Sequence, residues 1–252
     1  MTIGIVGCGW LGERIAASIC DEYSIRVTTT SQKKIELLDA KGFNPTVVSF
    51  SDDFNMPAPL LWREAQDLDV VIITVPFPNK NASFISQSAI IANLSSFLGD
   101  FKGQMFFMSS TSVYPDVSRE FTEDDLPLEE VGAERLVRSA YPQVNILRLA
   151  GLMGGNRLLS NYRVSNLELP VNHVHYVDVC GVVKKMIELH ATSRLYNVVA
   201  PMHPSKAEVI GAQKNESYPG NISSLGRIIS CQKLVSELNY QFRYPDPRLF
   251  HM

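Results

Sequence analysis

The glycine-rich stretch near the start of the chain constrains the fold more than any other feature. Residues 3–6 form an apolar run of strand length and lead directly into the pattern G-x-G-x-x-G at residues 7–12. Residues 13–19 then place apolar side chains at helical spacing. The pattern alone is a weak signal, but between a strand and a helix it predicts a dinucleotide site.

Each glycine of this loop has its own expected role. Gly7 allows the tight turn, Gly9 lets the backbone approach a pyrophosphate, and Gly12 lets the helix pack against the strand. The free N–H groups and the positive dipole end of the helix then face the phosphates. Cys8 is expected to contribute only its main chain, and Trp10 to pack beside the cofactor or at the rim. The predicted cofactor-binding residues of the loop are Gly7, Cys8, Gly9, Trp10, Leu11 and Gly12.

The end of the second expected strand, at residues 25–30, bears on the choice between NAD and NADP. An acidic residue about 20 positions after the glycine loop would hold the adenosine ribose 2′-hydroxyl. The chain offers Thr30, Ser31 and Lys33 there instead, which suit a 2′-phosphate. Alternatively, Ser31 caps a helix with solvated lysines that closes at Gly42. We expect NADP or NAD as cofactor and favour NADP.

Strand and helix patterns alternate through the first part of the chain. Further strands are predicted at residues 46–50, 69–76, 104–108 and 145–149, with helices at 83–98 and 129–139. This alternation predicts an α/β fold with a Rossmann-type, doubly wound parallel sheet. Asp52, after the third strand, could accept a hydrogen bond from the adenine amino group or belong to an ordinary polar turn. Val75 and Pro76 end the fourth strand at the sheet edge, where ligands bind in such folds.

The composition changes after residue 150, which suggests two domains. Residues 1–150 are predicted to form the dinucleotide-binding core, and residues 151–252 a small C-terminal α/β substrate-binding segment. Within this segment, a strand at 195–199 is expected to return to the main sheet. Ser205 and Glu208 form a capping box that predicts a helix start, and a loop is expected at residues 218–226.

Composition and charge restrict the partners. The formal net charge is −3 and no basic stretch is long, so we expect a small-molecule substrate and no nucleic acid. The longest apolar run is too short to cross a bilayer, so no membrane segment is predicted. The four cysteines are scattered without a C-x-x-C pair and no signal peptide is recognised, which indicates reduced thiols in a cytoplasmic protein. No ligand set surrounds His173 and His175, so no metal is predicted.

Four segments carry a resemblance to a known superfamily. Residues 109–115, S-S-T-S-V-Y-P after the fifth strand, resemble the S-S-x-x-V-Y-G segment of extended short-chain dehydrogenases/reductases, the superfamily of NAD-dependent epimerases and dehydratases. Residues 146–154 are similar to its I-L-R-x-x-x-x-Y-G stretch, residues 172–178 to N-x-I-H-V-x-D, and residues 196–199 to Y-N-V/I. The match covers nearly the whole chain in order. The short length and the G-x-G-W-L-G loop point to the YeeZ-like atypical members.

The sequence departs from the family in two places. Val6 stands at the first glycine position of the usual G-x-x-G-x-x-G loop. The catalytic Y-x-x-x-K should precede a helix with an acidic residue like Glu134, but residues 124–134 contain neither tyrosine nor lysine. Ser110 matches the family's active serine, which hydrogen-bonds the reacting oxygen. Without its partners it positions a substrate oxygen but transfers protons poorly. Tyr114 and Tyr176 are geometric substitutes, although packing is the commoner role of such residues.

The resemblance also assigns residues in the second half of the chain. It implies cofactor contacts at Ala150 and Gly151, which follow the sixth strand, and substrate contacts at Asn172 and His173. It gives His175 a structural role ahead of Asp178, which could cap the next helix. Two arginines of the loop after the sixth strand, Arg157 and Arg163, could hold an anionic substrate group, with solvated side chains as the default.

The resemblance implies an NAD(P)-dependent oxidoreductase or epimerase that acts on an unknown small molecule. Family members commonly dimerise through helices, so a homodimer is a further expectation. Because the Tyr/Lys pair is missing, the alternative is a regulatory module that senses NADP(H) without turnover. The first residues alone also resemble hydroxyacid dehydrogenases and imino-acid reductases, which have a helical second domain. The segments at 109–115 and 195–199 argue against that third interpretation.

Overall fold

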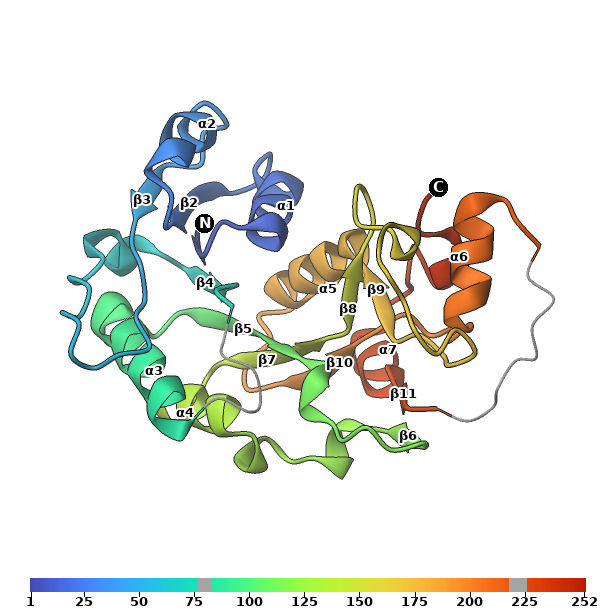
Figure 1. Ribbon diagram of the computed structural model, residues 1–252. Coiled ribbons are helices and arrows are strands. Elements are labelled where there is room, and N and C mark those ends of the chain that lie inside the picture. Colours follow the sequence, from blue (N-terminus) through green and yellow to red (C-terminus); the bar gives the residue numbers. More distant parts are fainter. Residues whose placement is uncertain (77–82, 218–225) are drawn as a thin grey trace. The chain divides into compact units, whose positions relative to one another are not determined.

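The computed structural model describes residues 1–76, 83–217 and 226–252, and its main feature is a parallel sheet of seven strands (Figure 1). The strand order is β3-β2-β1-β4-β5-β7-β10. The strands span Thr2–Val6 (β1), Ser24–Thr29 (β2), Pro45–Val47 (β3), Val70–Ile73 (β4), Gln104–Ser110 (β5), Asn145–Leu149 (β7) and Leu195–Val198 (β10). The predicted Rossmann-type, doubly wound α/β fold is therefore confirmed.

The strand order reverses beside β1. This strand pairs with β2 on one side and β4 on the other, so that Ile3 lies between Ile25 and Val70. From β1 the chain passes through α1 to β2, and it later returns to β4. In open α/β sheets, ligands bind outside the carboxyl ends of the strands at such a reversal. The glycine loop follows β1 at this edge of the sheet.

Seven α-helices lie in the described residues. They span Trp10–Ile19 (α1), Ile35–Asp39 (α2), Phe84–Leu98 (α3), Gly132–Ala140 (α4), Tyr176–Glu188 (α5), Lys206–Lys214 (α6) and Gln232–Leu238 (α7). The predicted capping box of Ser205 and Glu208 does open α6. The helix expected after Ser31 is instead a 3-10 turn, η1 (Gln32–Lys34), followed by the short α2. Ser31 makes no side-chain cap hydrogen bond, whereas Gly42, at φ +75°, closes the segment as predicted.

The expected third strand is shorter than predicted. Its pairing partner β2 ends at Thr29, which lies opposite Val47, so no further partner residue extends the ladder. Most of the loop predicted at 218–226 lies outside the described residues.

The chain forms two compact units, each assembled from three segments. Unit 1 comprises residues 1–109, 128–146 and 186–195, and unit 2 comprises residues 110–127, 147–185 and 196–252. The division at residue 150 that composition suggests stays a prediction.

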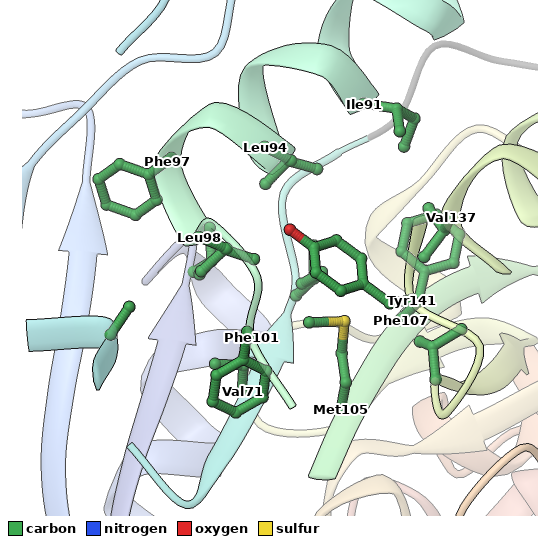
Figure 2. Packing of buried hydrophobic residues seen from close by; sticks show 14 of the residues in the cluster. Val71, Ile91, Leu94, Phe97, Leu98, Phe101, Met105, Phe107, Val137 and Tyr141 are labelled. Atoms are coloured by element: carbon green, nitrogen blue, oxygen red, sulfur yellow. The ribbon is translucent and has the colours of Figure 1, made fainter. Parts of the chain in front are cut away.

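Unit 1 has an apolar cluster where α3 and α4 pack on the sheet (Figure 2). Met105 and Phe107 of β5 meet Leu94 of α3 and Val137 of α4. The phenol of Tyr141 donates a hydrogen bond to the carbonyl oxygen of Gly99 at 3.0 Å, which joins the ends of these helices. The cluster also contains Val71, Ile91, Phe97, Leu98 and Phe101.

Unit 2 contains two small parallel sheets. One joins β8 (Gly151–Met153) to β9 (His173–His175), and the other joins β6 (Glu120–Phe121) to β11 (Ile228–Ile229). A small apolar cluster is formed by Leu159, Val171 and Val209.

Asp178 fastens the C-terminal tail of unit 2. The side chain was expected to cap α5, but it lies inside the first turn of that helix. Its carboxylate accepts hydrogen bonds from the backbone N–H groups of Arg243 (2.7 Å) and Tyr244 (2.9 Å) and from the phenol of Tyr240 (3.1 Å). Asp178 is fully buried and anchors the tail, since a buried carboxylate needs such donors.

Candidate functional site

The glycine loop of unit 1 has the geometry that each of its glycines requires. Gly7 has φ +98°, which favours glycine, and a Cβ there would lie 2.8 Å from a methyl carbon of Val75. Gly12 has no room either, because a Cβ would lie 2.6 Å from the carbonyl oxygen of Gly7 and 2.9 Å from Thr74 Oγ1. Helix α1 therefore packs closely against the loop and β1.

Gly9 differs from these two glycines. Its backbone is extended, and a Cβ built on it would approach nothing closer than the carbonyl oxygen of Gly7 at 4.0 Å. Gly9 is also the N-cap of α1, and no side chain caps the helix there. The helix thus begins at an open surface with its first N–H groups and its dipole available, as a pyrophosphate requires. The residues of this cradle fit a dinucleotide.

Two threonines brace the loop from the neighbouring strands, and the sequence analysis did not single them out. Thr28 Oγ1 of β2 accepts a hydrogen bond from Gly7 N at 2.9 Å. Thr74, directly after β4, donates its hydroxyl proton to the carbonyl oxygen of Gly7 at 2.5 Å. The signal that could have found them is a small hydroxyl residue at the end of each strand that flanks β1.

Cys8 and Trp10 occupy the intervening positions. The side chain of Cys8 is buried, and this burial raises the pKa of its thiol to about 11, so the thiol stays protonated near neutral pH. Trp10 is half-buried and lies under the guanidinium of Arg14, whose carbon is 3.9 Å from the ring centre. Leu11 is buried, so Leu11 and Cys8 can offer a ligand only their main chains.

The segment after β2 carries hydroxyls and lysines in unit 1. Thr30 and Lys33 are exposed, whereas the backbone N–H of Ser31 is held by Thr29 Oγ1 at 3.2 Å. The hydrogen bond from Lys41 is the main cause that lowers the pKa of the Glu13 carboxyl, and the charge of Lys34 adds to it. Lys34 therefore lies beside the first turn of α1, and the carboxylate of Glu13 is already paired.

The other candidates of unit 1 lie at the ends of β3 and β4. The carboxylate of Asp52 accepts a hydrogen bond from the Ser86 hydroxyl at 3.0 Å, a contact that joins the β3 loop to α3. Val75 packs on Gly7, and Pro76 follows it exposed to solvent.

Ser110 is an exposed residue of unit 2 at the start of a single 3-10 turn, η3 (Thr111–Val113). Its hydroxyl oxygen accepts a hydrogen bond from Ser112 N at 3.1 Å, which fixes the oxygen and leaves the proton free to donate. Ser110 can hold a substrate oxygen in this way.

The stretch that should carry tyrosine and lysine has a different local structure. It forms two short 3-10 turns, η4 (Glu123–Asp125) and η5 (Leu128–Glu130), and α4 begins only at Gly132. Glu134 in the first turn of α4 is buried and accepts the Ser109 hydroxyl at 2.6 Å within unit 1. The stretch carries carboxylates but neither tyrosine nor lysine, so the family's pair has no like-for-like replacement in it.

Tyr114 does not fill the gap. Its ring is buried in unit 2, its phenol donates to Asn197 Oδ1 at 2.9 Å, and the same oxygen accepts from Arg148 Nη1 at 2.8 Å. Burial raises the pKa of the phenol, against the opposing effect of the Arg148 charge. A phenol that is held on both sides in the interior is a structural element.

The candidate site residues from the second half of the chain, which lie in unit 2, differ from one another in their contacts. Asn172 uses both ends of its amide on the backbone, since Nδ2 donates to Arg227 O and Oδ1 accepts from Ile229 N, each at 2.8 Å. Asn172 therefore has a structural role, and its substrate contact stays a prediction. The ring of His173 lies against Gly151, and its Nδ1 is buried without a hydrogen-bond partner among the described residues. Ala150 N donates to Val198 O at 3.0 Å, so Ala150 is held in the sheet.

His175 has the structural role expected of it. Its ring lies 3.9 Å from that of Tyr244, and Nδ1 accepts from Val177 N at 3.3 Å. Arg163 is exposed, as a solvated arginine would be, and Arg157 is half-buried.

The described residues hold neither a cluster of metal ligands nor a membrane-spanning helix. Residues 1–76, 83–217 and 226–252 contain no group of three or more His, Cys, Asp or Glu side chains that could hold a metal ion. In the same ranges, no helix is long and apolar enough to span a membrane.

A parallel Rossmann sheet with a glycine turn after β1 is the architecture of the dinucleotide-binding class of folds. No family model matches the sequence. The chain is 28% identical to Protein YeeZ of Escherichia coli K12 over 97% of both chains. It is thus a YeeZ homologue, as its glycine loop predicts, and the predicted recognition is confirmed.

Solved structures with the same fold agree. A putative NAD-dependent epimerase/dehydratase from Methylobacillus flagellatus matches 97% of this chain and 94% of its own at a TM-score of 0.73 and 19% identity. Human epimerase family protein SDR39U1, solved with NADPH, matches 99% and 97% at a TM-score of 0.68 and 11% identity. A dTDP-glucose 4,6-dehydratase from Bacillus anthracis, solved with NAD, matches 97% of this chain and 92% of its own, with a TM-score of 0.68 and 12% identity. The fold is that of the NAD(P)-binding epimerase and dehydratase proteins.

Proposed function

We propose that the protein is an NAD(P)-dependent oxidoreductase or epimerase of the short-chain type that acts on a small molecule. The observation that carries the proposal is the open N-terminus of α1 at Gly9, where no atom of the described residues lies closer than 4.0 Å to the place of a Cβ. The loop residues Gly7 to Gly12 would bind the pyrophosphate through their main chain. Hydride transfer would be the chemistry of the cofactor, and the protein would orient the reactants.

We propose NADP as the preferred cofactor. Thr30, Ser31 and Lys33 follow β2 where a carboxylate would select a bare ribose diol. Lys34 supports this, because its charge reaches the first turn of α1. The nearby carboxylate, on Glu13, is paired with Lys41 and would not repel a phosphate.

Calorimetric titration with NADPH and NADH tests both proposals. We expect binding of both, with NADPH about 10-fold tighter, which corresponds to about 1.4 kcal/mol. Lys34→Gln should weaken NADPH and leave NADH within about twofold, whereas Lys102→Gln, whose partner is the exposed Asp100, should change neither. If neither nucleotide binds, the proposed function is wrong, and equal affinities would overturn the NADP preference.

Ser110 is the residue proposed to hold the reacting oxygen. Its hydroxyl is exposed, oriented by Ser112 N, and has no acceptor for its proton among the described residues. A reductase assay on a panel of carbonyl compounds with Ser110→Ala as the paired variant tests this. We expect turnover that falls about 100-fold in the variant. Cofactor binding without turnover on any compound would instead favour the NADP(H)-sensing module.

The remaining residue assignments belong to the same proposal. Ala150 and Gly151 would lie at the cofactor, and His173 would contact the substrate. Asp52 would accept from the adenine amino group while keeping its bond to Ser86. The cytoplasmic location and the homodimer stay predictions from the sequence.

A further inference from the structure

Arg227 of unit 2 is a half-buried cation whose side chain is bound to a backbone carbonyl. Among the described residues its side chain makes one hydrogen bond, from Nη1 to the carbonyl oxygen of Tyr114 at 3.1 Å. Among the described residues no carboxylate pairs with it, and residues 77–82 and 218–225 contain no Asp or Glu. By contrast, Arg119 is paired with Asp125, and Arg248 with Asp246.

The backbone around Arg227 is held tightly. Its carbonyl oxygen accepts from Asn172 Nδ2, and the other end of the same amide binds Ile229 N. Ile228 and Ile229 form β11, which pairs with β6, and Ile228 N donates to Arg119 O at 3.0 Å. Asn172 therefore binds the backbone on either side of Ile228 and holds the carbonyl group of Arg227. A side chain on such a fixed backbone loses little entropy when it binds a ligand.

The contact with Tyr114 places the guanidinium close to Ser110. Ser110 and Tyr114 are the two caps of the single turn η3. The turn has three residues and rises about 6 Å, at about 2 Å per residue. Arg227 thus lies about the length of a small metabolite from the Ser110 hydroxyl, and both residues belong to unit 2.

A guanidinium has five N–H donors, and the bond to Tyr114 uses one of them. Burying half of this cation without a counter-ion is unfavourable unless an anion completes the site. Planar, bidentate recognition of a carboxylate or phosphate is the interaction for which arginine is best suited.

We infer that Arg227 binds an anionic oxygen group of the substrate, a carboxylate or a phosphate, while Ser110 holds its reacting oxygen. The inference rests on the proposed function, since it names the substrate class of that site. It also gives Asn172 the part of a positioning residue that acts through the backbone of Arg227.

Anion titration of the whole protein under saturating NADPH tests the inference, because the cofactor then blocks the glycine loop to phosphate. Inorganic phosphate and malonate are the two probes, followed by calorimetry, and they distinguish a phosphate from a carboxylate ligand. We compare wild type with Arg227→Gln, whose amide can still donate to Tyr114 O but carries no charge. Arg119→Gln is the matched control, because Arg119 directly precedes β6, the strand that pairs with β11.

We expect millimolar binding of at least one probe, weakened about 10-fold in Arg227→Gln and changed less than about twofold in Arg119→Gln. Equal binding by Arg227→Gln and wild type, or no binding of either probe by wild type, would overturn the inference. If NADPH itself does not bind, the titration is repeated in Gly9→Ala, whose added methyl group blocks the loop. A dependence on Arg227 there supports the anion site even though the proposed function has failed.

Discussion

Gly9 and Gly12 lie three residues apart in one loop, yet they have opposite surroundings. Gly12 is packed against the carbonyl of Gly7 and the hydroxyl of Thr74, whereas Gly9 faces open space. At Gly12 the absence of a side chain allows close packing within the chain. At Gly9 it leaves room for a ligand such as a pyrophosphate. The two glycines therefore separate stability from binding.

Alanine at each position should show this separation. Gly12→Ala should lower the free energy of unfolding by about 1–3 kcal/mol, because the methyl group overpacks the contact between α1 and the loop. Gly9→Ala should change it by less than about 1 kcal/mol, since the backbone there is extended, but should abolish binding of NADPH. Urea denaturation and calorimetry measure the two quantities. A Gly9→Ala variant that binds NADPH normally would contradict the role given to the open space.

Tyr114→Phe separates a structural tyrosine from a catalytic one. Removing the hydroxyl leaves Arg148 Nη1 and Asn197 Oδ1 without their partner in a buried site. We expect a loss of about 1–3 kcal/mol in the free energy of unfolding. Turnover per folded molecule should stay within about twofold of wild type. A selective loss of turnover in a variant that unfolds like wild type would instead make Tyr114 an acid/base residue.

At the scale of elements, the glycine loop is held by the strands on either side of β1. Thr28 comes from β2 and Thr74 from the end of β4, and both bind the main chain of Gly7. The loop is thus shaped before any nucleotide arrives. Pre-organisation of this kind lowers the cost of binding.

Thr74→Val should reveal this bracing. Valine keeps the shape of threonine but loses the bond to Gly7 O, which should cost about 1 kcal/mol of stability and weaken NADPH binding about fivefold. Thr2→Val is the control, because Thr2 is half-buried in the same sheet at the start of β1, at the end opposite the loop. The same loss of affinity in both variants would show that the hydroxyl of Thr74 has no special part.

The sequence predicts those elements whose structure is determined by residues close to them in the chain. The strands around the loop and the start of α6 depend on nearby residues, such as the capping pair Ser205 and Glu208, and were predicted correctly. The end of β3 depends on where β2 ends, and the function of Asp178 depends on a tail more than 60 residues later. Hydrogen bonds between distant segments leave no periodic pattern, so Thr28, Thr74 and Arg227 were not found as site residues.

At the scale of the whole molecule, the buried histidines lie in unit 2. Burial lowers the pKa of both His173 and His175 to about 4 and also lowers that of His203. Nearby positive charges, Lys206 beside His173 and Arg243 beside His175, act in the same direction. These histidines stay neutral in the folded chain at pH values where the unfolded chain already binds protons.

Stability should therefore fall with pH in a defined window. The folded state takes up protons only near pH 4, whereas the unfolded state does so near pH 6.5, so the contribution is complete above about pH 6.5 and is lost towards pH 4. For His175 the full loss is about 3 kcal/mol. Urea denaturation at pH 7 and pH 4.5 measures it, with His175→Asn as a variant that does not titrate. An unchanged difference between the two pH values in that variant would contradict this role of His175.

The position of Trp10 would let its fluorescence report nucleotide binding at the glycine loop. The chain has two tryptophans, and Trp62 is buried and stacked on Phe97 with ring centres 5.2 Å apart. Trp10 instead stands at the open start of α1 under the Arg14 guanidinium. A reduced nicotinamide cofactor bound at the loop would absorb the emission of Trp10 by energy transfer. Replacing Trp62 with phenylalanine would leave a single fluorophore, so nucleotide exchange could be followed in real time without a label.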